Sequence, residues 1–306
     1  MAWITGTQAA DTLLGTAGQD VLIGRGAADF LSGGEEDDII LGGAGDDTIG
    51  GDNLPLPGSV SPWGPTPPGE TPEFPSGRGA FLGKVGNNLI LAGGGDDSVV
   101  AGFGADTVLG GSGNDTIEGY GAVYLYSRVP NAWINTDGPD LLHGGPGDDL
   151  LRGGGGDDRL HGGRGNDTLV GGVGVDTLVG GPGGDVFAFG RPYAGQFVAE
   201  TGVGPGQRDV ILDFEQHQDR IDLTGFASLA AGQAAPLFLG TQPFVASWAL
   251  QVRYAIEGDR TLVQFVAAPI GGAPEDGTPP PVPDGPTGEI ELSGIHHLRA
   301  ADFILA

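Results

Sequence analysis

The chain has 306 residues, including 62 glycines, 23 prolines and no cysteine, and its 40 acidic and 13 basic residues give a formal net charge of −27. This charge argues against a nucleic-acid binder, which needs cationic side chains to meet phosphates. The lack of cysteine excludes disulfides and thiolate metal sites, and no run of 18 apolar residues predicts a membrane span. The start, MAWITGTQAADTLLG, has neither the basic nor the apolar region of a secretory signal peptide. Glycine and proline at this level indicate disorder unless they recur with a period.

A nine-residue period begins at Gly6, where the chain reads GTQAADTLL, GTAGQDVLI, GRGAADFLS, GGEEDDIIL and GGAGDDTIG. Each unit starts with glycine, has aspartate at its sixth place and has an apolar residue at its eighth. Because glycine reaches the positive φ values of tight turns at little cost, the first six residues predict a turn. The last three predict a short strand with its middle side chain facing inward. Two units then form one 18-residue coil, and successive coils stack in parallel in two sheets.

The period continues in two further blocks. The units from Gly83 are GKVGNNLIL, AGGGDDSVV, AGFGADTVL and GGSGNDTIE, and those from Asn135 are NTDGPDLLH, GGPGDDLLR, GGGGDDRLH, GGRGNDTLV, GGVGVDTLV and GGPGGDVFA. A proline-rich and an aromatic-rich segment separate the three blocks. The predicted limits are 1–51 for the first block, 52–82 for the proline-rich insertion, 83–119 for the second block, 120–134 for the aromatic insertion, 135–190 for the third block, 191–208 for a linker and 209–306 for a C-terminal cap with a proline-rich insert at 267–288.

One apolar side chain per unit predicts a thin core. Its members, all at the eighth place, are Leu13, Leu22, Leu31, Ile40, Ile49, Ile90, Val99, Val108, Ile117, Leu142, Leu151, Leu160, Leu169, Leu178 and Phe187. Burial of so few side chains does not offset roughly 1–2 kcal/mol of backbone ordering per residue. The fold therefore needs a second source of stability, and turns rich in carbonyls with a repeated carboxylate offer the oxygen ligands that Ca²⁺ prefers.

The strict unit GGxGxDxUx, in which U is apolar, resembles the nonapeptide repeat of calcium-binding RTX proteins. We therefore predict an all-β fold, namely a calcium-binding parallel β-roll with a β-rich C-terminal cap and secretion module. Turns two units apart share an edge of the roll, so an ion fits between them, and pairing within the blocks predicts roughly nine Ca²⁺ ions.

The predicted ligands come from the side chains and the main chain of these turns. The carboxylate candidates are Asp11, Asp20, Asp29, Asp38, Asp47, Asp97, Asp106, Asp115, Asp140, Asp149, Asp158, Asp167, Asp176 and Asp185. The carbonyl candidates are Gly42, Gly43, Gly45, Gly110, Gly111, Gly113, Gly144, Gly145, Gly147, Gly153, Gly154, Gly156, Gly162, Gly163, Gly165, Gly171, Gly172 and Gly174. Asn88 fills the sixth place of its unit, where we expect weaker binding.

The segment RDVILDFEQHQDRIDLTGF, residues 208–226, breaks the period. It resembles the strand pair that follows the RTX repeats in the serralysin C-terminal domain, through Asp209, Asp213, Phe214, Asp219, Ile221 and Asp222. FLGTQPF, LQVRYA, TLVQF and IELSGIHHLRAADFILA resemble the rest of that domain, whereas the insert APIGGAPEDGTPPPVPDGP departs from it. The resemblance implies type I export from a Gram-negative cell, with the secretion apparatus as a partner and ADFILA as the apolar end of the signal.

Motifs of catalysis are missing from the sequence. None of His143, His161, His217, His296 and His297 begins HExxH, the zinc-protease motif of serralysins, and no GxSxG or phosphate-binding loop occurs. His143 and His161 are 18 residues apart, so we expect them to stack on adjacent coils as a solvated stripe rather than as a metal pair. We therefore predict that the protein is not an enzyme, unless the aromatic insertion acts on glycans.

Two features leave other functions open. The aromatic insertion contains Tyr120, Tyr124, Tyr126 and Trp133, which form either a flap over one sheet or a surface that contacts a partner or stacks on sugars. Apolar residues also occupy outward places, with Val21, Ile23, Ile39 and Leu41 expected on one outer face and Leu89, Leu91 and Leu109 on another. Because exposed apolar patches are usually covered, we expect the proline-rich insertion or a second molecule there.

The sequence thus predicts a secreted calcium-binding protein, extracellular or at the cell surface, that is non-catalytic and structural or adhesive. In the calcium-poor cytosol, carboxylate repulsion and the thin core leave the chain unfolded, and extracellular calcium folds it. The alternatives are a self-associating surface-layer or filament subunit and a glycan-binding or polysaccharide-modifying module.

Overall fold

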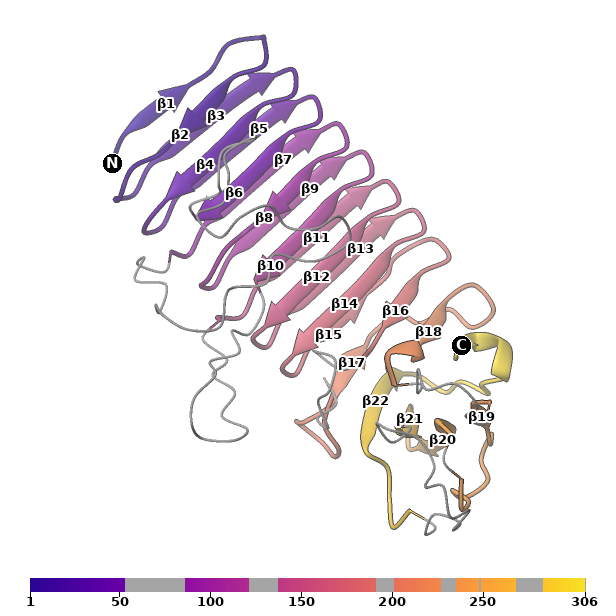
Figure 1. Cartoon of the computed structure of the whole chain (residues 1–306). Helices are drawn as coiled ribbons and strands as arrows, with labels where there is room; N and C mark the ends of the chain where they lie inside the picture. The colour runs from indigo at the N-terminus through magenta and orange to yellow at the C-terminus, as the bar shows by residue number, and fades with distance from the viewer. Residues whose placement is uncertain are drawn as a thin grey trace, which may run out of the picture.

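The computed structural model describes residues 1–52, 86–120, 137–190, 201–226, 235–247, 249–267 and 283–305. In these residues the protein is all-β, a two-sheet parallel roll that leads into a β-rich cap, as the sequence predicts (Figure 1). The helical elements of the described ranges are two short 3-10 turns, η1 (Thr224–Phe226) and η2 (Ala300–Asp302). Within the same ranges no helix is long and apolar enough to cross a membrane.

The strands alternate between two sheets along the roll. In sheet order, the thirteen-stranded sheet contains β1 (Trp3–Thr5), β3 (Val21–Gly26), β5 (Ile39–Ala44), β7 (Leu89–Gly94), β9 (Thr107–Ser112), β11 (Leu141–Pro146), β13 (Arg159–Arg164), β15 (Thr177–Val179), β17 (Asp209–Ile211), β22 (Gly288–Ser293), β21 (Arg260–Val266), β20 (Gln251–Glu257) and β19 (Leu237–Phe238). The ten-stranded sheet contains β2 (Thr12–Leu14), β4 (Phe30–Gly34), β6 (Thr48–Asp52), β8 (Ser98–Val100), β10 (Thr116–Tyr120), β12 (Leu150–Gly155), β14 (Thr168–Val173), β16 (Val186–Ala188), β18 (Arg220–Asp222) and β23 (Phe303–Ile304).

The eighth-place side chains form the core between the two sheets of the roll. Leu22 lies opposite Ile40 in one sheet, and Leu151 lies opposite Leu169 in the other, so the side chains stack in two parallel columns. All the predicted core residues are buried, and the most exposed of them, Leu13, is 8% exposed. The prediction of a thin core is therefore confirmed.

The three repeat blocks form one continuous roll. Ile40 of the first block pairs in register with Ile90 of the second, and Val108 pairs with Leu142 of the third. The intervening residues 53–85 and 121–136 lie outside the described residues, and with them most of the predicted proline-rich and aromatic insertions, including Tyr124, Tyr126 and Trp133. The predicted domain limits stay a prediction.

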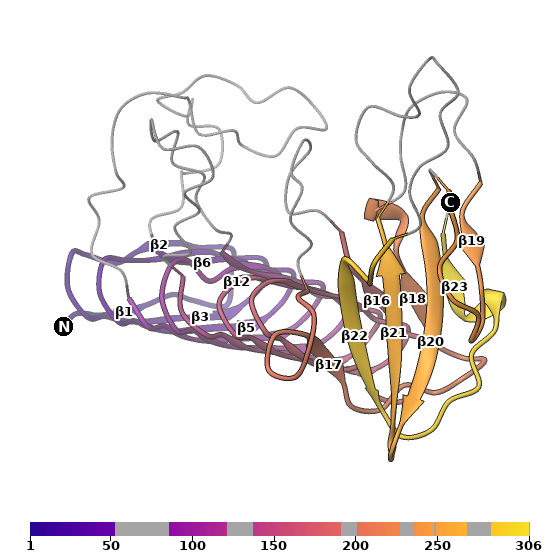
Figure 2. The ribbon, with the colours of Figure 1, turned by 90° about the horizontal axis from the view of Figure 1, so that it is seen from below.

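The cap closes the C-terminal end of the roll (Figure 2). β17 and β18 continue the two sheets in parallel, and Ile211 lies opposite Leu178. β22 pairs in parallel with β17, and β22, β21 and β20 are joined as antiparallel neighbours. Aromatic side chains join the aliphatic ones in the core here, and the buried rings of Phe226 and Phe265 have centroids 4.5 Å apart.

The outward apolar side chains lie on one face of the roll. Val21, Ile39 and Leu89 are register partners on β3, β5 and β7, and the adjacent row consists of Ile23, Leu41, Leu91 and Leu109. The prediction of two separate faces was wrong, because it treated the first insertion as a break, whereas β5 pairs directly with β7.

Candidate metal centre

Most turns of the roll place positive φ angles at the second and fourth residues of the unit. In the turn from Gly42 to Asp47, Gly43 has a φ of 121° and Gly45 a φ of 116°. Residues with a Cβ avoid this region, which explains why glycine recurs at both places. Arg25 and Ala27 occupy the same two places with φ values of 95° and 66°, so their turn is strained.

The sixth-place residues form a hydrogen-bonded ladder along each edge of the roll. After the first residue of each ladder, Oδ1 of each member accepts the main-chain N–H of the sixth-place residue one coil earlier, at 2.7–2.9 Å. The ladder on one edge comprises Asp11, Asp29, Asp47, Asp97, Asp115, Asp149, Asp167, Asp185 and Asp219. The ladder on the other edge comprises Asp20, Asp38, Asn88, Asp106, Asp140, Asp158, Asp176 and Asp209. These bonds fix the orientation of each side chain.

Twelve of these carboxylates have a buried Oδ2 atom that accepts no hydrogen bond in the structure. They are Asp29, Asp38, Asp47, Asp97, Asp106, Asp115, Asp140, Asp149, Asp158, Asp167, Asp176 and Asp185. Burial of an ionised oxygen without a partner is unfavourable unless a cation neutralises it. The repeated orphan oxygen is therefore the strongest structural indication of bound cations in the described residues.

The unpartnered oxygens converge with main-chain carbonyls of the next coil. The position that a Cβ on Gly42 would take lies 2.5 Å from both Asp47 Oδ2 and the carbonyl oxygen of Ala92. These two oxygens are therefore about 5 Å apart at most, a span that one Ca²⁺ with bonds of about 2.3–2.6 Å bridges. Asp149 Oδ2 and the carbonyl of Gly162 meet in the same way beside Gly144. Carboxylate and carbonyl oxygens are hard ligands, so the residues present fit calcium.

The main chain has to supply many of the ligands at such a site. In the described ranges no group of three or more His, Asp or Glu side chains gathers around one point. Among the predicted carbonyl ligands, the structure places those of Gly42, Gly144, Gly153, Gly162 and Gly171 next to a sixth-place carboxylate. The remaining carbonyl ligands stay a prediction.

Burial raises the pKa of many carboxyl groups in the interior of the ladders. It raises the pKa of Asp140 to about 9, and the neighbouring charges of Asp106 and Asp158 add to the effect. Burial likewise raises the pKa of Asp106 and of Asp158 to about 7. The ion-free turn therefore favours the protonated form, because each carboxylate is desolvated and close to like charges.

Two of the predicted carboxylate ligands, Asp11 and Asp20, depart from this arrangement. Their Oδ2 atoms accept hydrogen bonds from their own turns. The sequence pattern identifies the sixth place but does not show what the second carboxylate oxygen contacts. Conversely, Asp209 and Asp219 lie outside the repeat period and still end the two ladders. The sequence does contain a sign of their role. Each stands two residues before a buried isoleucine, which is the spacing between the sixth-place aspartate and the eighth-place apolar residue of a repeat unit.

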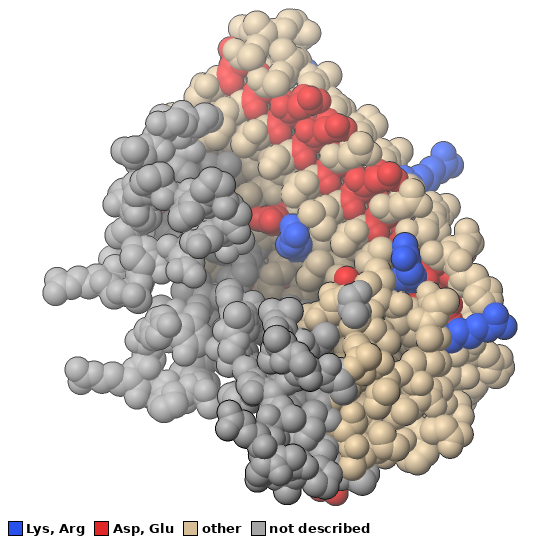
Figure 3. All heavy atoms as spheres, turned by 45° about the vertical axis from the view of Figure 1, so that its right-hand side comes forward, with Lys and Arg blue, Asp and Glu red and all other residues tan. Residues whose placement is uncertain are grey.

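Acidic side chains also follow the surface of the roll (Figure 3). Asp46, Asp96, Asn114 and Asp148 are exposed fifth-place residues, and Oδ1 of each accepts the N–H of the fifth-place residue one coil later, at 2.7–3.0 Å. This second ladder runs in the opposite direction to the buried one. The exposed carboxylates therefore offer matched controls for the buried ones.

His143 and His161 stack on the adjacent strands β11 and β13, as expected from their spacing. Their ring centroids are 4.4 Å apart and both residues are half-buried on the outer face of the roll. Burial lowers the pKa of His143, and the neighbouring His161 adds to the effect.

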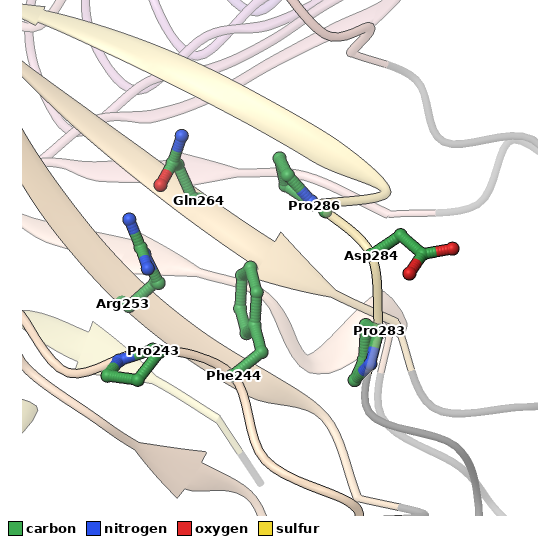
Figure 4. A pocket seen from close by; sticks show the side chains of 8 residues that line it. Pro243, Phe244, Arg253, Gln264, Pro283, Asp284 and Pro286 are labelled. Carbon is green, nitrogen blue, oxygen red and sulfur yellow. The ribbon is translucent and has the colours of Figure 1, made fainter.

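A cavity of about 300 Å³ lies on the cap, between strands β20 and β21 and the segment 283–286 (Figure 4). The Arg253 guanidinium lies 5.3 Å from the centroid of the Phe244 ring, and Arg253 Nε is buried and has no hydrogen-bond partner among the described residues. Gln264 lines the same cavity, and the Asp284 carboxylate points away from Arg253 in Figure 4. The lining of the cavity therefore combines an aromatic ring with a cationic side chain whose Nε has no partner in the described part of the chain.

Comparison with known proteins agrees with the repeat pattern. A family model described as RTX calcium-binding nonapeptide repeat (4 copies) matches residues 5–38, 23–53, 82–119, 134–169 and 152–187. Among solved structures, the chain is similar to the AlgE6R3 subunit of the Azotobacter vinelandii mannuronan C5-epimerase, with 29% identity over 56% of this chain and 81% of that one and a TM-score of 0.35. The AlgE6R2 subunit of the same enzyme is 27% identical over 55% of this chain and 89% of that one, with a TM-score of 0.32.

The extracellular lipase LipA from Serratia marcescens is 16% identical, with a TM-score of 0.33, and the match covers 94% of this chain but 40% of the lipase. A search of curated protein sequences gave no significant match.

Proposed function

Since the repeats of this chain are RTX calcium-binding nonapeptide repeats, we propose that it is a secreted protein whose β-roll folds on binding Ca²⁺ outside the cell. We propose that it is non-catalytic and serves as a structural or adhesive component of the cell surface or the extracellular matrix. The observation that carries the proposal is the set of twelve buried, unpartnered Oδ2 atoms. One ion for each of these oxygens gives twelve, more than the nine predicted within separate blocks, because the ladders also continue across the breaks and into the cap.

The chain's own residues prepare the turns for this role. Bound calcium supplies the positive charge and the coordination that the buried oxygens lack. The ladder hydrogen bonds hold each carboxylate with Oδ2 toward the next coil, and the glycines of the turn expose their carbonyls. Repulsion among 40 acidic residues and a core of two aliphatic columns disfavour folding without ions. Folding and ion binding are therefore linked.

A calcium titration at pH 7.5, followed by circular dichroism and sedimentation velocity, tests the proposal. We expect a transition from coil to β-structure that EDTA reverses, and a much weaker response to Mg²⁺, which keeps its waters and demands octahedral geometry. A chain that is already folded in EDTA at this pH contradicts the proposal.

Two adjacent residues provide a matched pair of variants for the same titration. Asp149→Asn removes a buried, unpartnered oxygen and should raise the calcium concentration at the midpoint. Asp148→Asn changes the neighbouring exposed carboxylate, keeps its Oδ1 acceptor for Asn166 N–H, and should leave the midpoint nearly unchanged.

We propose type I secretion as the export route, with the secretion apparatus as a transient partner. The support is the resemblance of residues 208–226 to the serralysin C-terminal domain. In the structure this segment provides β17 and β18, which continue both sheets of the roll. Deletion of residues 209–306 should abolish export from a Gram-negative host that carries a type I system, as measured by the ratio of extracellular to cellular protein.

Self-association is an alternative supported by the outer face of the thirteen-stranded sheet. On this face Ile39 and Leu89 are register partners and are 39% and 38% exposed. Sedimentation equilibrium in calcium tests it, because Ile39→Lys combined with Leu41→Lys should then dissociate the assembly. Thr48→Lys, on the other sheet, is the control. An unchanged mass in the double variant counts against assembly through this face.

Glycan binding is a second alternative, and the cap cavity favours it. The Phe244 ring and the unpartnered Arg253 Nε suit a sugar that carries a carboxylate. A glycan array that includes polyuronates, probed with the wild type, Arg253→Met and the insertion variant Trp133→Ala, separates the two candidate surfaces. The absence of any bound glycan in the wild type rejects this alternative.

A further inference from the structure

The first turn on each edge of the roll differs from the turns that follow. Its second place holds a threonine, Thr7 on one edge and Thr16 on the other, where most later turns have glycine. Thr7 donates its N–H, at 2.5 Å, and its hydroxyl, at 2.9 Å, to Oδ2 of Asp11. Thr16 donates the same two groups to Oδ2 of Asp20, at 2.6 and 2.7 Å. The oxygen that lacks a partner in the later turns is therefore satisfied by the protein in these two.

Backbone geometry explains the difference. Gly43 occupies the second place with a φ of 121°, and Oδ2 of Asp47 in the same turn is unpartnered. Arg25 also keeps a positive φ, so a Cβ alone does not change the turn. The two threonines do not have positive φ angles, because a β-branched side chain is strongly disfavoured there. Their N–H groups consequently point at the carboxylate of their own turn.

In two more turns an N–H donor occupies the place that a cation would take. Glu215, four residues before Asp219, donates its N–H to Oδ2 at 2.7 Å, which is the spacing that the threonines use. At Asn88 an amide replaces the carboxylate, and Nδ2 donates to the carbonyl of Ala101 at 3.3 Å. Ala101 is the first residue of the turn one coil later on the same edge. Its carbonyl therefore corresponds to that of Ala92, which lies beside Asp47. A donor hydrogen thus lies where a cation would meet oxygen.

We propose that these four turns hold no calcium, because in each of them a hydrogen-bond donor of the protein already occupies the place of the cation. The inference rests on the proposed calcium function. Thr7 and Thr16 each satisfy Oδ2 of their turn with two donors, whereas the second-place residues with positive φ leave Oδ2 free for a cation. The residue type alone does not decide this, because Thr136 stands four residues before Asp140, whose Oδ2 is unpartnered. Calcium is therefore confined to the twelve interior carboxylates with a free Oδ2, and the N-terminal coil is held by threonine instead.

Native mass spectrometry of the calcium-loaded chain tests the inference by counting ions. The variant Thr7→Gly/Thr16→Gly should hold two more ions than the wild type, because glycine permits the positive φ of the interior turns. Asn88→Asp restores the carboxylate in place of the amide donor and should hold one ion more. Thr16→Ser retains both donors, so it is the matched control and should keep the wild-type count.

The outcomes separate this inference from the proposed function. Equal counts in the wild type, the double variant and Asn88→Asp overturn the inference and leave the calcium function intact. A wild-type chain that holds no ions overturns the proposed function itself. If the double variant fails to fold, the counts of Thr16→Gly and Asn88→Asp decide in the same way.

Discussion

Protons and calcium should compete for the same buried oxygens, so the ion-free protein should be most stable in acid. Burial raises the folded-state pKa of Asp106 and of Asp158 from 3.8 to about 7. A shift of about 3 units corresponds to about 4 kcal/mol for each group once it is ionised. Two such groups already approach the whole stability of a typical domain, about 5–15 kcal/mol.

The sign follows from the raised pKa values. Because the folded chain binds more protons than the unfolded chain between about pH 4 and pH 7, its ion-free stability is present below pH 4 and falls as the pH rises through 7. Circular dichroism of the chain, stripped of calcium on a chelating resin and kept dilute because the sequence pI is about 4.1, should show β-structure near pH 4.5 and coil at pH 8. Added calcium should restore the β-structure at pH 8.

A variant checks that these two groups are responsible. Asp106→Asn/Asp158→Asn removes two titrating charges, so its ion-free unfolding should move to higher pH while its calcium requirement increases. The reasoning is refuted if the stripped wild type is equally folded at pH 4.5 and pH 8, or if the double variant unfolds at the wild-type pH.

The packing of the roll and cap gives three further expectations, each measured as unfolding in saturating calcium. Leu151→Ala opens a cavity in the single column of core side chains of its sheet and should lower the free energy of unfolding by about 2–5 kcal/mol. Leu141→Ala removes a side chain that is 46% exposed and should change this free energy little. Ala27→Gly relieves a φ of 66° and should gain up to about 1 kcal/mol; a loss would show that this turn is not strained. Arg208→Met leaves the buried Glu289 carboxylate without its 3.1 Å ion pair and should cost about 3–5 kcal/mol, and an unchanged cap would contradict that role.

The sequence predicts the roll well because its information is periodic. The eighth place of each nine-residue unit holds an apolar residue, such as Leu160, which can be buried only between the two sheets. Two such units make the 18-residue coil. Continuity across the breaks is not predictable in this way. Whether Ile40 meets Ile90 depends on where a long insertion returns the chain, and no local pattern of residues states this.

The candidate sites show a similar division. The sixth-place aspartates are visible as a pattern, and the structure aligns them in ladders. The state of Oδ2 depends on which donors the folded turn aims at it, so Asp11 and Asp29 both stand at the sixth place in the sequence but differ in the structure. The cap cavity at Arg253 depends on strand pairing between distant segments and has no sequence signature.

The interruptions of the roll all occur at one kind of turn. Each long break in the repeat period follows β6, β10 or β16, which belong to the ten-stranded sheet, and precedes β7, β11 or β17, which belong to the thirteen-stranded sheet. The turns of the opposite edge, which end at the aspartates from Asp11 to Asp219, are uninterrupted. Since the entropy of closing a loop grows slowly with its length, one edge can accept foreign sequence while the other keeps the coils aligned. The turns that lead from the ten-stranded to the thirteen-stranded sheet are therefore the natural sites for engineering. We expect the roll to tolerate an inserted epitope or small domain there without changes to its core.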